Sequence, residues 1–312
     1  MKTVSIVIPV FNEENIVEEL IFRLKNATHN LRYSFEFVLV DDGSSDNTLK
    51  KVLAIQNEEP RLKIVKLSRN WGFQNAYNAG LEFASGDCVI LMDGDLEDPP
   101  ELIPEFLKKW EEGFDVVYAV KETRYESKFK KLMFHIFYKL MKRFSELNID
   151  EQAGMFSLID RKVVCELKKF KEKSKYYVGL RFFIGFNQTK IFYHRDKRFA
   201  GVPKQTFRKL VNYALNAFFS FSFLPIRLLT YFGIFLLLVI ILISIIFSII
   251  KIWGFVIISG WISIVLLILW ILAVQIIFMG IIGEYVARIF DEVRNRPYYI
   301  VENVFEFNKK KG

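Results

Sequence analysis

Apolar and polar residues follow two different periods along the first 120 residues. Runs rich in β-branched residues predict strands at 3–10, 35–44, 61–68 and 87–95. Between them, apolar side chains recur at helical spacing over residues 13–28, 46–57 and 75–85. Strands that alternate with helices build a mostly parallel, doubly wound sheet whose binding sites lie at the carboxyl ends of the strands. We therefore predict an α/β, Rossmann-like domain over residues 1–205.

Two long uncharged runs follow in the last third of the chain. Residues 228–250 and 252–283 carry no charged side chain, and only Lys251 separates them. As a helix the first run is ~34 Å long, which is enough to cross a hydrocarbon core of about 30 Å. We therefore predict two transmembrane helices within 228–283, at about 228–250 and 259–283. Two buried helices of a soluble protein are the alternative, which runs of this length disfavour.

Basic residues on both sides of this hairpin predict its orientation. Arg227 precedes the first span, and Arg288, Arg294 and Lys309 follow the second, while the intervening loop is nearly uncharged. We therefore expect the protein in the inner or cell membrane. The positive-inside rule places both of its termini and the N-terminal domain in the cytoplasm. The N-terminal segment MKTVSIVIPVF is too short and too rich in β-branched residues to be a signal peptide. Residues 284–312 are then a cytoplasmic tail.

Two further segments have basic and apolar faces. Residues 128–147 repeat apolar side chains at helical spacing, with lysines on the other side, which is typical of a helix in the membrane interface. A surface helix packed on the sheet is the alternative. Residues 206–227 lead into the first span and are expected to form a juxtamembrane amphipathic helix.

The charge of the chain fits an anionic membrane surface better than nucleic acid. The formal net charge is +8, and no nucleic-acid-binding motif accompanies it. The two cysteines have no reason to pair in the cytoplasm. Polar Gln275 and the small Gly280 and Gly283 leave room for a homo-oligomer through the membrane helices.

Acidic residues crowd the end of the fourth predicted strand. Asp93 and Asp95 lie two residues apart on an extended segment, so both carboxylates can share one cation, and Glu97 is a candidate third ligand. Hard oxygen ligands select Mg²⁺ or Mn²⁺, which substrate phosphates usually complete. The alternative is a solvated acidic loop in which Asp98 caps a helix.

Four ordered motifs, SIVIPVFNEE, VLVDDGSSDNT, LSRNWGFQNAYNAGL and VILMDGDLEDPPELI, resemble family 2 glycosyltransferases with a GT-A fold. The two spans and the basic pattern near residue 195 are similar to polyprenyl-phosphate glycosyltransferases of the dolichyl-phosphate mannose synthase type. The bacterial undecaprenyl-phosphate glucosyltransferases with a two-helix membrane anchor are included among these. The resemblance extends over essentially the whole chain.

The resemblance implies a role for several groups of residues. The acids Asp93 and Asp95 match a metal-binding pair, and either Asp41 or Asp42 matches the contact to the nucleotide base. The other positions that match nucleotide-binding segments are Pro9, Phe11, Glu13, Asn70 and Gly72. Basic positions suited to phosphate are Arg124, Arg195, Arg198 and Lys204.

The segment 151–161 departs from the family pattern. Many relatives read G-D-F-R-L there, which aligns Met155 with the usual Asp and Ser157 with the usual Arg. A lipid phosphate is largely ionised at neutral pH and needs no general base, so such an acceptor tolerates the loss. An alcohol acceptor needs a base, and Glu151, Asp150 or Glu97 would then have to serve.

The expected function is the inverting transfer of one sugar from a nucleotide-sugar, a UDP-hexose or GDP-mannose, to a polyprenyl phosphate, with Mg²⁺ or Mn²⁺. A processive polysaccharide synthase is disfavoured, because two spans build no pore and the chain has no Q-x-x-R-W motif. A transferase acting on another lipid or on a lipid-linked glycan stays open. So does an inactive membrane scaffold that binds nucleotide-sugar, which Met155 and Ser157 favour.

Overall fold

The computed structural model describes residues 1–121, 153–170, 172, 177–193, parts of 231–249, and 260–307. The chain divides into two compact units, Met1–Phe218 with Pro297–Gly312, and Phe219–Arg296. The predicted amphipathic segments 128–147 and 206–227 lie outside the described residues, and both stay predictions.

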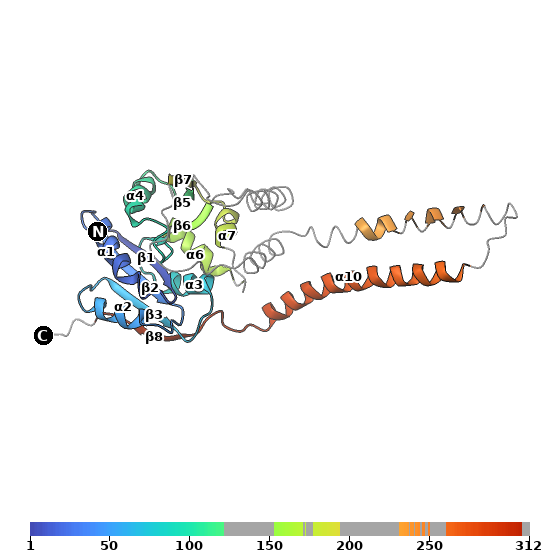
Figure 1. Ribbon diagram of the computed structural model, residues 1–312. Helices are drawn as coiled ribbons and strands as arrows, with labels where there is room; N and C mark the ends of the chain where they lie inside the picture. The colour runs from blue at the N-terminus through green and yellow to red at the C-terminus, as the bar shows by residue number, and fades with distance from the viewer. Residues whose placement is uncertain are drawn as a thin grey trace. The chain divides into compact units, whose positions relative to one another are not determined.

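A mixed eight-stranded sheet forms the centre of the first unit (Figure 1). Its strand order is β7-β5-β6-β4-β1-β2-β3-β8. The strands are β1 (Thr3–Val10), β2 (Ser34–Asp41), β3 (Leu62–Leu67), β4 (Cys88–Leu91), β5 (Val116–Lys121), β6 (Ala153–Asp160), β7 (Gln188–Tyr193) and β8 (Val301–Phe305).

The helices of this unit connect the strands as the alternating pattern predicted. They are α1 (Val17–Thr28), α2 (Thr48–Gln56), α3 (Phe73–Phe83), the 3₁₀ turn η1 (Pro100–Leu102), α4 (Ile103–Glu111), α6 (Arg161–Lys169) and α7 (Tyr177–Phe183). Strands β1, β2, β3 and β4 pair in parallel, whereas β6 runs antiparallel to both β4 and β5. The fold is therefore the predicted Rossmann-like, GT-A arrangement with an antiparallel addition.

Both faces of the central strand β1 are buried under helices. Ile6 and Ile8 share a core cluster with α1 and α4. On the other face α3 packs so closely that a Cβ added at Gly80 would lie 2.1 Å from a methyl group of Val7. This double cover explains why the strand reads as an apolar run without alternation, and it leaves the carboxyl ends of the strands as the place for polar chemistry.

The second unit contains the long helix α10 (Trp261–Val293). Within it, Trp270–Val293 is long and apolar enough to cross a membrane, with a mean hydropathy of 1.8. Its large side chains are exposed, Ile276 at 60% and Ile277 at 61%. Among the described residues of the first predicted span, Tyr231–Ile243 is apolar but shorter. One helix of spanning length is thus observed in the described part of the chain, and the predicted two-helix hairpin is not confirmed.

The strand β8 was not anticipated from the sequence. It lies beyond α10, in residues expected to form a tail, and pairs antiparallel with β3 at the edge of the sheet. Its side chains are mostly exposed, so an apolar run, the usual sign of a strand, is missing. The chain therefore returns from the second unit to complete the sheet of the first.

Candidate active site

The acidic turn at the end of β4 is held in one conformation by buried neighbours. Tyr77 of α3 donates its hydroxyl to Asp93 Oδ1 at 2.7 Å, and Tyr193 of β7 donates to Asp98 Oδ1 at 2.5 Å. A Cβ at Gly94 would lie 2.7 Å from the carbonyl oxygen of Pro9. Only glycine therefore lets the turn rest against the end of β1.

Burial and mutual repulsion change the acidity of this turn. Burial, and then the charges of Asp98 and Asp95, raise the pKa of Asp93 to about 7. Burial likewise raises the pKa of Asp98, while the charge of Lys121 opposes that change. Like charges held together out of water favour a cation among them. The turn therefore has the electrostatics of a cation site.

The metal-binding role of Asp93 and Asp95 stays a prediction from the sequence. No group of three His, Cys, Asp or Glu side chains within the described ranges is arranged to hold a metal ion. Asp95 Oδ1 accepts the backbone N–H of Glu97 at 3.2 Å, which shapes the turn. Asp93 and Asp95 offer hard oxygen ligands of the kind that Mg²⁺ and Mn²⁺ prefer, and substrate phosphates usually complete such a site. Glu97 as a third ligand stays a prediction that the described side chains do not support.

The neighbouring acids Asp41 and Asp42 differ in their hydrogen bonds. Asp42 accepts the backbone N–H groups of Trp71 and Gly72, at 2.7 and 2.9 Å, one on each carboxylate oxygen. Asp41 Oδ1 accepts the N–H of Ser44 at 3.0 Å, whereas its buried Oδ2 has no partner among the described residues. Burial raises the pKa of both, that of Asp42 to about 6. Asp42 thus supports a loop, and Asp41 keeps a spare acceptor.

The loop after β1 is joined to the loop after β2. The N–H of Asn12 donates to Ser44 Oγ at 2.9 Å, and the N–H of Glu13 donates to Thr48 Oγ1 at 2.8 Å. Pro9 lies at the end of β1, opposite Val40 of β2. Phe11 is half-buried and Glu13 buried, so the structure brings the predicted residues Pro9, Phe11 and Glu13 to the same edge as Asp41.

The loop 68–72 is the third part of this edge. Gly72 has φ +90°, a conformation that favours glycine, and precedes α3. The Arg69 guanidinium lies 3.8 Å from the centre of the Trp71 ring. Arg69 therefore packs on an aromatic ring in a cation–π contact. Asn70 is exposed.

Two features near the acids were missed or changed relative to the sequence prediction. Lys121, the last residue of β5, lies opposite Tyr193 in the sheet and acts electrostatically on both Asp93 and Asp98. Only tertiary structure brings it to the acids, so no sequence spacing marked it. Leu91, the last residue of β4, pairs with Ser157, and Met155 lies two residues before Ser157 on β6. The Ser157 hydroxyl is buried and donates to the carbonyl of Met155.

The predicted basic residues Arg124, Arg195, Arg198 and Lys204 lie outside the described residues, as do the alternative bases Asp150 and Glu151. Their roles stay predictions. A buried arginine does approach the changed segment: Arg181 of α7, 3% exposed, donates to the carbonyl of Gly154 at 3.2 Å.

Comparison with known proteins agrees with this geometry. The model of the family described as Glycosyl transferase family 2 matches residues 5–168. An uncharacterized glycosyltransferase of Synechocystis sp. is 40% identical over 96% of this chain and 95% of its own. The bactoprenol glucosyl transferase of Shigella phage SfII is 35% identical over 96% of this chain and 97% of its own.

Solved structures give the same fold at lower sequence identity. Glucosyl-3-phosphoglycerate synthase from Mycobacterium tuberculosis, solved with Mn²⁺ and UDP, has a TM-score of 0.50 and 18% identity, over 69% of this chain and 75% of that one.

Proposed function

Because this chain belongs to glycosyl transferase family 2, we propose that it transfers one sugar from a nucleotide-sugar to a polyprenyl phosphate at the cytoplasmic face of the membrane. The donor is a UDP-hexose or GDP-mannose, and the reaction inverts the anomeric carbon with metal assistance. The lipid acceptor is supported by relatives that are bactoprenol glucosyl transferases, 34% to 35% identical over nearly the full chain.

The observation that carries the proposal is the acid turn itself. Asp93, Asp95 and Asp98 gather at the carboxyl ends of the strands, beside the loops that the family uses for nucleotide. Asp41 keeps a spare acceptor oxygen at that edge, whereas both oxygens of Asp42 are occupied by backbone N–H groups. We therefore assign the contact to the nucleotide base to Asp41.

The absence of a carboxylate at Met155 fits a phosphate acceptor. Met155 lies two residues before Ser157, the partner of Leu91 at the end of β4, and the family resemblance aligns it with an Asp that is a candidate catalytic residue. A phosphate monoester has a second pKa near ~6 and attacks without losing a proton in the transition state. Attack from the face opposite the leaving diphosphate forms the bond from phosphate oxygen to sugar carbon and inverts that carbon.

The acids would contribute to the departure of the nucleoside diphosphate. Asp93 and Asp95 would hold Mg²⁺ or Mn²⁺, which stabilises the charge that develops on the leaving group. Tyr77 orients Asp93 through its hydrogen bond, and Tyr193 fixes Asp98 behind it. Lys121 supplies a positive charge beside the same carboxylates.

The pairing of β8 with β3 supports a two-span anchor. Residues before 219 and residues after 296 belong to one folded unit, so both lie on the same side of a membrane. A chain that leaves and returns to one side crosses an even number of times. A single crossing by α10 is incompatible with this, and the apolar residues 228–250 are the remaining segment with the length and composition for a second.

The acceptor distinguishes this function from its alternatives. Purified protein in detergent is given a nucleotide-sugar and either undecaprenyl phosphate or undecaprenol, the alcohol of the same chain. We expect glycosylated product from the phosphate alone, at a rate that does not fall between pH 7 and pH 8. Product from the alcohol, or only from a lipid-linked glycan, would contradict the proposed acceptor.

A further inference from the structure

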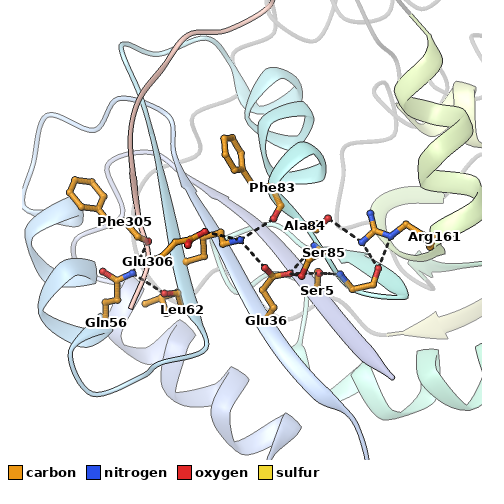
Figure 2. Close-up of polar contacts among 12 residues, drawn as sticks. Ser5, Glu36, Gln56, Leu62, Phe83, Ala84, Ser85, Arg161, Phe305 and Glu306 are labelled. Carbon is orange, nitrogen blue, oxygen red and sulfur yellow. Dashed lines mark hydrogen bonds and ion pairs between the residues drawn. The ribbon is translucent and has the colours of Figure 1, made fainter. Parts of the chain in front are cut away.

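The last strand of the sheet is fixed by polar contacts rather than by burial. Gln56 donates its side-chain N–H to the carbonyl oxygens of both Leu62 and Phe305, at 2.8 Å each, and so ties β8 to the start of β3 (Figure 2). Lys63 pairs with Glu306 at 3.1 Å, and Lys66 pairs with Glu302 at 2.9 Å. The strand therefore depends on ion pairs that a charge change can weaken.

These contacts continue into a partly buried polar network. Lys63 also pairs with Glu36 at 3.1 Å, and Glu36 accepts hydrogen bonds from Ser5 and Ser85 (Figure 2). Five exposed or half-exposed residues alone would not hold a strand in place, because a short edge strand buries little apolar surface. The network supplies the missing attachment.

At its other end β8 adjoins the donor-side loop, which is defined here as residues 68–72. The backbone N–H of Ser68 donates to the carbonyl of Ile300 at 2.9 Å. This bond lies just beyond the irregularity in pairing at Lys66 and Leu67. The first residue of the donor-side loop is thus hydrogen-bonded to the segment that follows α10.

From Ser68 a chain of contacts continues to the acids of β2. The Ser68 hydroxyl accepts the indole N–H of Trp71 at 3.2 Å, and the backbone N–H of Trp71 donates to Asp42 at 2.7 Å. Gly43 packs against the same loop, since a Cβ there would lie 2.4 Å from the carbonyl carbon of Arg69. A displacement of the donor-side loop would therefore displace the residues around Asp41 and Asp42.

We propose that β8 and Ser68 are positioning elements of the donor site: the strand that returns from the membrane helix holds the donor-side loop in the conformation that binds nucleotide-sugar. The inference rests on the proposed function, because it takes the residues at this edge to bind the donor. Neither β8 nor Ser68 is placed in contact with the reacting atoms.

Two sets of variants of the full chain in detergent test this. The double variant E302K/E306K turns the ion pairs of Glu302 on β8 and of Glu306 just after it into repulsions. Its matched control, E58K/E105K, makes the same change of charge at two exposed positions, one in the turn after α2 and one on α4. Separately, Ser68→Ala removes the acceptor of the Trp71 indole, and Ser68→Thr retains it. Steady-state constants are measured for donor and lipid acceptor, together with the binding of UDP or GDP.

We expect E302K/E306K and Ser68→Ala to raise the donor KM and the nucleotide Kd about fivefold to tenfold. The KM for the lipid should stay within about twofold, and Ser68→Thr and E58K/E105K should match the wild type. Hydrogen exchange at Val301–Phe305 reports whether β8 has loosened.

An unchanged donor KM in a variant whose β8 amides exchange faster would overturn the inference, as would equal losses for donor and lipid. If the wild type itself binds no nucleotide, the proposed function fails instead, and this inference fails with it. Should E302K/E306K not fold, the pair Ser68→Ala and Ser68→Thr decides the outcome alone.

Discussion

At the scale of single residues, the candidate site consists of acidic side chains and of the residues from other elements that surround them. Asp93 and Asp95 were predicted from their spacing, because a D-x-D pair at a strand end is a local pattern. The groups that surround this turn come from other elements: Tyr77 of α3 donates to Asp93, Tyr193 of β7 donates to the neighbouring Asp98, and Lys121 of β5 acts on both of these acids. No spacing links residues that only the folded sheet brings together, so the sequence marks the acids and not their supports.

Asp95→Ala is expected to remove transfer without unfolding the protein. Asp95 is half-buried, and it accepts a hydrogen bond from a backbone N–H of its own turn, so we expect the variant to fold. Loss of a residue that stabilises leaving-group charge lowers kcat by about 100-fold or more. The comparison is with Glu105→Ala, an exposed acid of α4, under matched protein levels and with circular dichroism to verify folding. Full activity of Asp95→Ala in the presence of excess EDTA would contradict the metal-assisted mechanism.

Asp42 is expected to make stability depend on pH in a defined window. Burial raises the pKa of Asp42 from its ordinary 3.8 to about 6, so the folded state binds the proton more tightly than the unfolded state. Stability is therefore highest below the unfolded pKa and is lost as the pH rises through about 6. A shift of this size corresponds to about 2 to 3 kcal/mol.

The measurement compares thermal midpoints of wild type and Asp42→Asn at pH 4.5 and pH 7.5. At pH 4.5 we expect the thermal midpoint of the wild type to rise by several degrees relative to that of Asp42→Asn, because the side-chain amide of the variant does not titrate. A difference between the two proteins that is the same at both pH values would show that Asp42 is not the titrating group.

At the scale of elements, the turns between strands and helices decide the geometry. The four N-terminal strands were predicted within a few residues of their observed ends, because their apolar runs are buried on both faces. The strand β8 was not, since Val-Glu-Asn-Val-Phe is short, polar and exposed. Its place is set by pairing with β3 and by ion pairs, which are long-range effects that a local pattern does not carry.

The variants Gly72→Ala and Gly113→Ala distinguish the cost of backbone strain from an effect on donor binding. Both glycines have positive φ, +90° and +96°, and an added Cβ meets nothing within 4 Å at either position. Each substitution should therefore cost about 1 to 2 kcal/mol in backbone strain. Only Gly72 belongs to the donor-side loop, so only Gly72→Ala should also raise the donor KM. Equal kinetic effects of the two variants would remove the loop from the donor site.

At the scale of the whole molecule, connectivity constrains how the chain meets the membrane. The sequence predicted two spans from two uncharged runs, and the described residues contain one helix of spanning length. The sheet supports the proposed topology independently, because β8 pairs with β3: a chain that crosses a membrane between residues 219 and 296 and returns to this sheet crosses it an even number of times. Hydropathy alone does not constrain the number of crossings, because it contains no information on which strands pair.

Cysteine labelling in intact cells tests this topology. Cys165 is exposed in the first unit and should be protected from a membrane-impermeant maleimide until the cells are lysed. In a Cys165→Ser background, a cysteine at Ser259, where the second predicted span begins, should react before lysis. Labelling of both positions from outside, or of neither, would contradict an even number of crossings.

The central claim is that the protein transfers a sugar to a lipid phosphate with the help of the acidic residues at the end of β4. Its most direct test is a radiolabel-transfer assay with purified wild type and Asp95→Ala, Mg²⁺ or Mn²⁺, undecaprenyl phosphate and a panel of labelled UDP- and GDP-sugars. We predict that one donor gives an organic-extractable, acid-labile product with the wild type, and that Asp95→Ala gives none. Nucleotide binding by the wild type with no lipid product from any donor, or equal product from both proteins, would contradict the account.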